Sequence, residues 1–386
     1  MPIPSSIIIR ITTVPLSLSW LLKGQLTFIN NYFDLLAISS SGEDLELVKK
    51  QGIRTKAVEM TRTITPLMDI FAIVKLFLIL KKEKPFIVHT HTPKAGLVGM
   101  VAAKFAGVPF KLHTVAGLPL MESTGIKRTI LEFVEKVIYS FADKVYPNSY
   151  GLNEFILQNN FCKADKLKVI GNGSSNGIDV EYFIRNKDVI KQAQELRTNL
   201  NFTENDIVFC FIGRIVKDKG INELLSTFNK LSLKLDNIKL LLVGPFEEKL
   251  DPISENSKQI IENNSSVIHV GFQNDIRPYL AMSDIFVFPS YREGFPNVVM
   301  QAGAMGVPSI VTNINGCNEI IEDSKNGLII EPKNKNELEE AMLILIEDEV
   351  LRNQLADNSR KMIVERYEQK YVWNEILKEY KSLEKR

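Results

Sequence analysis

The chain has 386 residues, of which 45% are hydrophobic and 24% charged, and its net charge at pH 7 is +1. This length exceeds what one hydrophobic core usually serves, so it predicts two domains. The small net charge argues against a general nucleic-acid binder, which would be plainly basic. The charge is unevenly spread, because residues 1–150 carry 18 lysines and arginines against 11 acidic residues. The two halves either meet different partners or differ only in incidental surface charge.

The cysteines and the N-terminus indicate a cytoplasmic protein. Cys162, Cys210 and Cys317 are widely spaced and odd in number, which is typical of reduced thiols and not of a disulfide framework or a zinc site. Residues 6–12 lack the basic lead and cleavage site of a signal peptide, so we expect a first buried strand there. No run of 18 apolar residues occurs, so no membrane-spanning helix is expected.

Short apolar runs rich in β-branched residues alternate with helical patterns along the first half. The predicted strands are Ile7–Ile11, Leu35–Ser39, Phe86–Thr90, Lys111–Thr114, Lys144–Tyr146 and Lys168–Ile170. The predicted helices are Leu67–Lys82, Ala95–Ala106, Ile126–Phe141 and Gly151–Gln158. This alternation predicts an α/β fold with a parallel sheet covered on both faces.

The second half repeats the alternation after a break. Its predicted strands are Ile207–Ile212, Ile238–Val243, Val267–Val270, Ile285–Phe288, Ser309–Thr312 and Leu328–Ile330. Residues 171–205 begin with a Gly/Asn/Ser cluster typical of a turn or hinge. We therefore expect domains at 1–185, joined by a C-terminal helix at about 367–386, and at 186–366, with a cleft between them. A TIM barrel is the competing α/β architecture, which the mid-chain break disfavours.

The densest chemical signal follows the strand that ends at Phe288. Glu293 lies in a loop at the carboxyl end of that strand, and a helix is predicted to begin near Pro296–Asn297 and to end at Gly306. Free amides at the start of this helix suit a diphosphate. Gln301, about one turn into the helix, is expected to face the same ligand.

Two cations follow another strand of the second half. Arg214 and Lys219 lie five residues apart after Ile207–Ile212, and a guanidinium with an ammonium can hold a pyrophosphate without metal. Either cation alone would be interpreted as a solvated loop charge. The pair near the Glu293 loop favours a phosphate site.

Three of the four histidines, His89, His91 and His113, lie near strand ends in the first half. A lone histidine there is more often structural than catalytic. No metal-ligand cluster, dinucleotide-binding glycine motif or Walker phosphate loop is found, so we expect no metal and no cofactor.

These motifs resemble those of the retaining glycosyltransferases of family 4, which have the GT-B fold of two Rossmann-like domains. The resemblance spans about residues 85–370 and rests on the ordered segments 213–220, 290–299 and 176–179, with His91 and His113 matching first-domain positions. It implies that Arg214 and Lys219 bind the donor diphosphate and that Glu293 binds the donor sugar. His113 would lie near the transferred sugar. The remaining implied donor-binding residues are Gly294, Phe295, Pro296, Asn297 and Val298.

The chain departs from this family at two places. Gln301 stands where the family usually has a second glutamate that binds the ribose, so one charge is missing. The usual glycine pair after the first strand is absent. Lys23 and Gly24 are its nearest counterpart, and with His91 they form the expected acceptor side.

Residues 89–146 resemble a bacterial branch that builds capsule or O-antigen polysaccharides. That branch implies a UDP-linked, often N-acetylated sugar donor and a lipid-diphosphate-linked saccharide acceptor. The main rival is a catalytically weak sugar-nucleotide-binding subunit of an assembly complex, which Gln301 favours. A GT-B phosphorylase or epimerase is a second rival that would need different loop residues.

Residues 67–84 predict a strongly apolar helix that ends in a lysine cluster. One interpretation is a buried helix with its lysines reaching solvent. The other is that this face, with Lys104, Lys127 and Arg128, rests on an anionic membrane, which implies a peripheral protein on the inner face of the plasma membrane.

Overall fold

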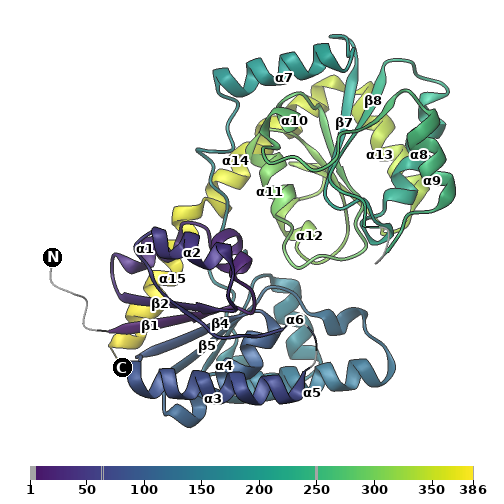
Figure 1. The fold of residues 1–386 in the computed structure, drawn as a ribbon. Helices are drawn as coiled ribbons and strands as arrows, with labels where there is room; N and C mark the ends of the chain where they lie inside the picture. The colour runs from purple at the N-terminus through teal and green to yellow at the C-terminus, as the bar shows by residue number, and fades with distance from the viewer. Residues whose placement is uncertain (1–5, 62, 64, 248–250, 386) are drawn as a thin grey trace. The chain divides into compact units, whose positions relative to one another are not determined.

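The structure is a computed structural model that describes residues 6–61, 63, 65–247 and 251–385. It consists of two compact units (Figure 1). Unit 1 comprises Met1–Gly177 and Gln369–Arg386, and unit 2 comprises Ile178–Glu368. The chain therefore leaves unit 1 at Gly177, some residues before the expected boundary at 185.

Unit 1 contains a six-stranded parallel sheet in the order β3-β2-β1-β4-β5-β6. The strands are β1 (Ile7–Ile11), β2 (Asp34–Ser39), β3 (Arg54–Ala57), β4 (Ile87–His91), β5 (Phe110–Val115) and β6 (Lys144–Pro147). Strand β1 is central and pairs in register with both β2 and β4, Arg10 lying opposite Ala37 and His89. This arrangement confirms the α/β prediction.

Helices cover both faces of the unit 1 sheet, as the continuous apolar strands require. One face packs against α3 (Pro66–Glu83), α4 (Pro93–Ala106), α5 (Gly125–Phe141) and α6 (Tyr150–Gln158). The other packs against α1 (Gln25–Asn30), α2 (Glu43–Lys50) and the C-terminal helix α15 (Gln369–Glu384). Residues at both ends of the chain thus build one core.

Two strand predictions in unit 1 were incomplete or wrong. Strand β3 was missed because its sequence, Arg-Thr-Lys-Ala, is polar, as suits an edge strand. The predicted strand Lys168–Ile170 does not form. The chain makes only a single bridge there, between Val145 and Leu167, before it turns at Gly171. That run is only three residues long and begins with a lysine, so it could not sustain a ladder beside the short strand β6.

Unit 2 contains a second six-stranded parallel sheet in the order β12-β11-β10-β7-β8-β9. Its strands are β7 (Ile207–Ile212), β8 (Ile238–Val243), β9 (Val267–His269), β10 (Ile285–Phe288), β11 (Ser309–Thr312) and β12 (Gly327–Ile330). The helices are α7 (Lys187–Asn199), α8 (Ile221–Ser232), α9 (Glu255–Asn263), α10 (Arg277–Ala281), α11 (Asn297–Ala304), α12 (Cys317–Ile320), α13 (Lys335–Glu347) and α14 (Glu349–Tyr367). Two separate open sheets rule out the TIM barrel.

The two sheets share one topology, because each winds outward in both directions from a central pair of strands. That pair is β1 and β4 in unit 1, and β7 and β10 in unit 2. Successive crossovers diverge between these central strands, which leaves an open crevice at their carboxyl ends. Ligands of open α/β sheets bind at such a point, so the loops after β7 and β10 are the first place to look for a site in unit 2.

Candidate functional site

The loops after β7 and β10 are in close backbone contact at this point. Gly220 ends a short turn, Lys217–Lys219, with φ +70°. A β-carbon there would lie 2.0 Å from the carbonyl oxygen of Pro289. The amide of Tyr291 also donates to the carbonyl of Asp218 at 2.8 Å. Glycine at 220 is therefore needed for the loop of Arg214 and Lys219 to reach the Glu293 loop.

Lys219 and Glu293 form an ion pair across these loops. Nζ of Lys219 bonds Oε1 of Glu293, and Oγ of Ser290 donates to the same carboxylate oxygen at 3.1 Å. The side chains are only 14% and 16% exposed. Nζ of Lys219 also lies 5.6 Å from the centroid of the Phe288 ring. The structure thus brings together two of the predicted site residues, and Ser290 and Phe288 hold the pair in place.

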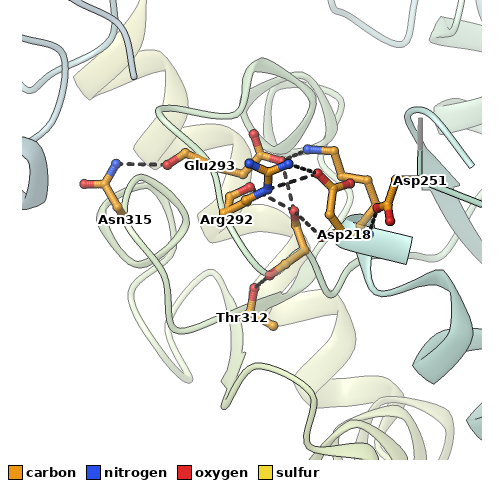
Figure 2. A network of polar contacts seen from close by, with 8 residues as sticks. Asp218, Asp251, Arg292, Glu293, Thr312 and Asn315 are labelled. Carbon is orange, nitrogen blue, oxygen red and sulfur yellow. Dashed lines mark hydrogen bonds and ion pairs between the residues drawn. The ribbon is translucent and has the colours of Figure 1, made fainter. Parts of the chain in front are cut away.

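Figure 2 shows the wider polar network around this pair. Arg292 donates to Oδ2 of Asp218 at 2.6 Å, and the amide of Asp218 donates to Oδ2 of Asp251 at 2.7 Å. Thr312 on β11 donates to the carbonyl of Ser290. The loops after β7, β8 and β10 and the end of β11 are thus connected, so these loops have little freedom to rearrange.

Arg214 lies at the more open side of the site. Its Nη1 donates to Oε2 of Glu247 at 2.6 Å, and the two side chains are 42% and 33% exposed. Burial lowers the pKa of the Arg214 guanidinium, but the bond to Glu247 and the negative charges of Glu247, Asp218 and Glu293 together outweigh burial and hold the pKa above its ordinary value. Arg214 therefore stays charged, as a phosphate-binding group must.

Helix α11 begins at Asn297, close to the predicted start, and Gly306 follows its end with φ +67°. The preceding loop is held by Asn315, whose Nδ2 donates to the carbonyls of Glu293 at 3.2 Å and Gly294 at 2.6 Å. A β-carbon at Gly316 would lie 2.5 Å from the Gly294 oxygen. These contacts turn the carbonyls of the loop toward α12.

The other predicted residues of this segment occupy the first turn and the loop before it. Gly294, Phe295 and Val298 are half-buried, Pro296 is buried and Asn297 is exposed. Gln301 is half-buried, and its side chain makes no hydrogen bond within the described part of the chain. It is available to a ligand.

The histidines of unit 1 lie inside the core. His113 is 2% exposed, its Nδ1 lies 2.7 Å from Oγ1 of Thr90, and a β-carbon at Gly96 would come within 2.6 Å of its ring. Burial lowers the pKa of His113 to about 3. The His113 ring faces α4 and α5. In the strand register Thr90 pairs with His113, so the next residue, His91, points to the other face of the sheet. The two predicted histidines are not brought together.

His91 stacks on His89, with ring centroids 4.4 Å apart, and burial lowers the pKa of both rings well below the ordinary value. His89 bonds Tyr380 of α15 at 2.6 Å. Arg10 lies beside them, 0% exposed, and donates to the neutral groups Tyr380 at 2.7 Å and Gln25 at 2.5 Å. This part of the sheet face therefore holds neutral histidines beside one buried cation, Arg10, whose charge also lowers the pKa of the two rings.

Lys23 and Gly24 precede α1 and lie under α15. A β-carbon at Gly24, which has φ +78°, would lie 2.5 Å from the Trp373 ring. The carbonyl of Lys23 accepts from Asn176 at 3.0 Å and Gln369 at 3.2 Å. These observations assign the turn a packing role, and its acceptor role stays a prediction.

Several site residues were not predicted from the sequence. Glu247 and Asp251 follow β8 and carry no motif of their own, and only tertiary structure brings them to the β7 loop. Thr13 and Thr92 meet at the crevice of unit 1, with their hydroxyls 2.7 Å apart. Thr92 has φ +78°, which is strained for a β-branched residue and typical of functional loops. That strain is invisible in the sequence.

Known proteins match the chain over almost its whole length. Residues 192–362 match the family described as "Glycosyl transferases group 1", and residues 34–173 match "Glycosyl transferase 4-like domain". The chain is 33% identical over 376 residues to the capsular polysaccharide biosynthesis glycosyltransferase CapM of Staphylococcus aureus, covering 97% of each protein. It is 31% identical to a UDP-Gal:alpha-D-GlcNAc-diphosphoundecaprenol alpha-1,3-galactosyltransferase of Escherichia coli, covering 87% of this chain and 85% of that one.

Solved structures agree on the fold. HepE of Anabaena in complex with UDP superposes with a TM-score of 0.79 at 20% identity, covering 97% of this chain and 99% of that one. A glycosyltransferase from Rickettsia africae gives a TM-score of 0.79 at 20% identity, covering 98% and 99%. The fold is therefore GT-B, as expected, with the C-terminal helix α15 packed on unit 1. The chain belongs to the group 1 glycosyltransferases, and the protein is a glycosyltransferase.

Proposed function

We propose that the protein is a metal-independent, retaining transferase that moves a sugar from a UDP-sugar to a lipid-diphosphate-linked saccharide in surface polysaccharide synthesis. The observation that carries this proposal is the convergence of Arg214, Lys219, Glu293 and the start of α11 at the crevice between β7 and β10. The names of two relatives support the acceptor class. Besides the galactosyltransferase of Escherichia coli, a Campylobacter jejuni enzyme that is 28% identical over 90% of each protein is named an N,N'-diacetylbacillosaminyl-diphospho-undecaprenol alpha-1,3-N-acetylgalactosaminyltransferase.

The proposed mechanism is substitution from the front face of the donor sugar. The departing diphosphate takes the proton of the incoming hydroxyl while Arg214, Lys219 and the amides at the start of α11 stabilise the negative charge that develops on it. Such preorganised electrostatic stabilisation is often the largest contribution to rate. Glu293, with one oxygen engaged by Lys219 and Ser290, keeps its second oxygen for the hydroxyls of the donor sugar.

The remaining residues have supporting roles in this proposal. Gln301 accepts a hydrogen bond from the ribose, and the backbone from Gly294 to Val298 lines the sugar and phosphate. His113 is neutral because its pKa is lowered, so it contributes to the sugar site by hydrogen bonding or packing and not by charge. Lys23, Gly24 and His91 belong to the proposed acceptor side.

The test is transfer of labelled sugar by the purified protein from a panel of UDP-sugars to an undecaprenyl-diphosphate-linked acceptor, with and without chelator. We expect transfer with retained configuration that EDTA leaves unchanged. Among the described residues no group of three or more potential metal ligands occurs. Abolition of transfer by EDTA would contradict metal independence.

A second candidate, a catalytically weak sugar-nucleotide-binding subunit, is favoured by Gln301 alone. It predicts that UDP-sugars stabilise the protein without turnover. Donor at 100 times its dissociation constant would stabilise by about 2.7 kcal/mol in either case. Turnover by the protein alone would exclude this candidate.

We also propose that the protein is cytoplasmic and binds the inner face of the plasma membrane peripherally. Within the described part of the chain, no helix meets the length and apolarity that a membrane span requires. Helix α3 buries Ala72, Leu76 and Leu80, but apolar side chains on its other side are exposed to solvent. The exposed apolar residues of α3, α4 and α5 are Leu67, Met68, Ile70, Phe71, Val74, Leu78, Phe105, Ile126, Ile130 and Phe133. Single exposed apolar residues are ordinary, but a group this large marks an interaction surface.

Cations accompany these side chains on the same helices. They are Lys75, Lys81, Lys82, Lys104, Lys127 and Arg128, and each adds about 1 kcal/mol at an anionic surface. Apolar residues with surrounding lysines suit a bilayer interface better than a soluble partner.

Sedimentation with vesicles of varying anionic-lipid content tests this localisation. Binding should rise with anionic lipid, weaken in high salt, and fall in Phe71→Ser, with Phe272→Ser, exposed in unit 2, as the control. Indifference to anionic lipid, or equal binding by Phe71→Ser, would contradict it.

A further inference from the structure

Glu247 is the partner of a cation that the proposed function assigns to the donor diphosphate. It follows β8, whereas Arg214 follows the neighbouring strand β7, and the bond between them, 2.6 Å long, is the only side-chain bond of Glu247 within the described residues. The Glu247 carboxylate thus accepts a hydrogen bond from the Arg214 guanidinium, to which a phosphate would have to bind.

The position of Glu247 is fixed by the backbone on its N-terminal side. The amide of Gly213 donates to Val243 at 2.9 Å, and the amide of Ile215 donates to Pro245 at 2.8 Å. A β-carbon at Gly244 would lie 1.8 Å from the carbonyl oxygen of Gly213, so the two loops can run this close only with glycine there.

A second attachment lies on the other side of Glu247. The carbonyl of Asp251 accepts from the amide of Lys217 at 3.2 Å, and its carboxylate accepts from the amide of Asp218 at 2.7 Å. Because the β8 loop is attached to the β7 loop before and after Glu247, the fold keeps the backbone of Glu247 within reach of Arg214.

The two ion pairs of the site differ in how easily they can separate. The Lys219–Glu293 pair is largely buried and supported by Ser290, so its separation would leave two desolvated charges. The Arg214–Glu247 pair is 42% and 33% exposed, so both groups can be hydrated on separation. An incoming diphosphate would also repel the Glu247 carboxylate at this short range.

We propose that Glu247 is an exchangeable counter-ion of Arg214. In the empty site it holds the guanidinium; it gives way to the donor diphosphate and pairs with Arg214 again as the nucleoside diphosphate leaves. This inference rests on the proposed function, because it requires a diphosphate at Arg214. It makes Glu247 a competitor of the ligand and a residue that favours product release.

Calorimetric titration of the full-length protein with UDP, at low and high salt, tests the exchange. Glu247→Gln should bind UDP about two- to fivefold more tightly than the wild type, since only the competing charge of an exposed pair is lost. The gain should shrink at high salt and vanish when Arg214→Ala is added. The matched control is Glu255→Gln, an exposed glutamate at the start of α9, which should leave the affinity unchanged.

A steady-state measurement completes the test. Glu247→Gln should show a lower KM for the donor and stronger inhibition by UDP, without a higher kcat. Equal or weaker UDP binding by Glu247→Gln, while the wild type binds UDP, would overturn the exchange and leave the proposed function intact. Failure of the wild type to bind UDP would instead overturn the proposed function and this inference with it.

Discussion

Units 1 and 2 have the same sheet topology, yet the carboxyl ends of their central strands carry different chemistry. In unit 2 the loops at these ends bear the largely buried ion pair Lys219–Glu293 and, with Glu247 from the loop after β8, the more exposed pair Arg214–Glu247. In unit 1 the corresponding region holds neutral histidines, the hydroxyl pair of Thr13 and Thr92, and one buried cation, Arg10, without a carboxylate partner among its hydrogen bonds within the described residues. The topology therefore determines where a crevice opens, and the loops determine what it can bind. Under the proposed function, the charged crevice of unit 2 binds the donor diphosphate and the crevice of unit 1 binds the acceptor.

The largest expected effect tests the charged crevice. Lys219→Ala or Arg214→Ala should slow transfer by roughly 2–4 kcal/mol of barrier, because each removes a stabiliser of the leaving diphosphate. Steady-state transfer kinetics would measure this. Lys217→Ala, an exposed lysine of the same turn, is the control and should keep near-normal activity. Full activity in the Lys219 and Arg214 variants would show that the charged crevice of unit 2 does not stabilise the leaving diphosphate.

Acid should destabilise unit 1 first. Burial lowers the folded-state pKa of His89, His91 and His113, so below pH 6.5 the unfolded state binds more protons and stability falls as pH falls. Each histidine contributes about 1.4 kcal/mol per pH unit. Burial raises the pKa of Glu135 to about 7. Between about pH 7 and pH 4.5 this carboxyl group therefore increases the free energy of unfolding as pH falls, which offsets the effect of one histidine. The net loss is about 3 kcal/mol per pH unit.

The two tryptophans, Trp20 and Trp373, both belong to unit 1, so their fluorescence reports its unfolding alone. Fluorescence should change at a higher pH than the far-ultraviolet circular dichroism of the whole chain. His91→Phe removes one titrating ring whose two nitrogens make no hydrogen bond within the described residues, so it should make the pH dependence shallower. Coincident transitions with an unchanged slope would show that the histidines do not control acid stability.

Glu293→Gln separates sugar binding from nucleotide binding within the charged crevice. Loss of charge-assisted hydrogen bonds should slow transfer by roughly 1.5–3 kcal/mol, while UDP binds nearly normally because the diphosphate contacts remain. Transfer kinetics combined with UDP titration would measure both. Weakened UDP affinity with unchanged turnover would mean that Glu293 serves the nucleotide and not the sugar.

The smallest expected effect is that of Gln301→Glu. Its side chain is half-buried and makes no hydrogen bond within the described residues, so a charge there is tolerated and the variant should fold and transfer sugar within a few-fold of the wild type. Donor KM and kcat are the measurement. A collapse of activity in a folded protein would contradict the assignment of Gln301 to the ribose.

The sequence by itself determined the two-sheet α/β architecture and the segments of unit 2 that surround the crevice. Strands β7, β8, β10 and β11 coincide with their predicted ranges, because a fully buried parallel strand must be apolar along its length. The start of α11 was also recognisable from Pro296 and the glycine after its end, since these residues act through local backbone geometry. The resemblance to family 4 rests on the same local segments.

Only the tertiary structure decided which charges meet. Glu247 and Asp251 reach the β7 loop because β8 lies beside β7, a relation between strands that no local pattern encodes. The edge strand β3 escaped prediction because one-sided pairing tolerates polar residues. His91 and His113 look alike in the sequence, but the pleat of adjacent strands sends their rings to opposite faces of the sheet. Burial then makes both neutral, because desolvation depends on what packs above a residue and not on its neighbours in the chain.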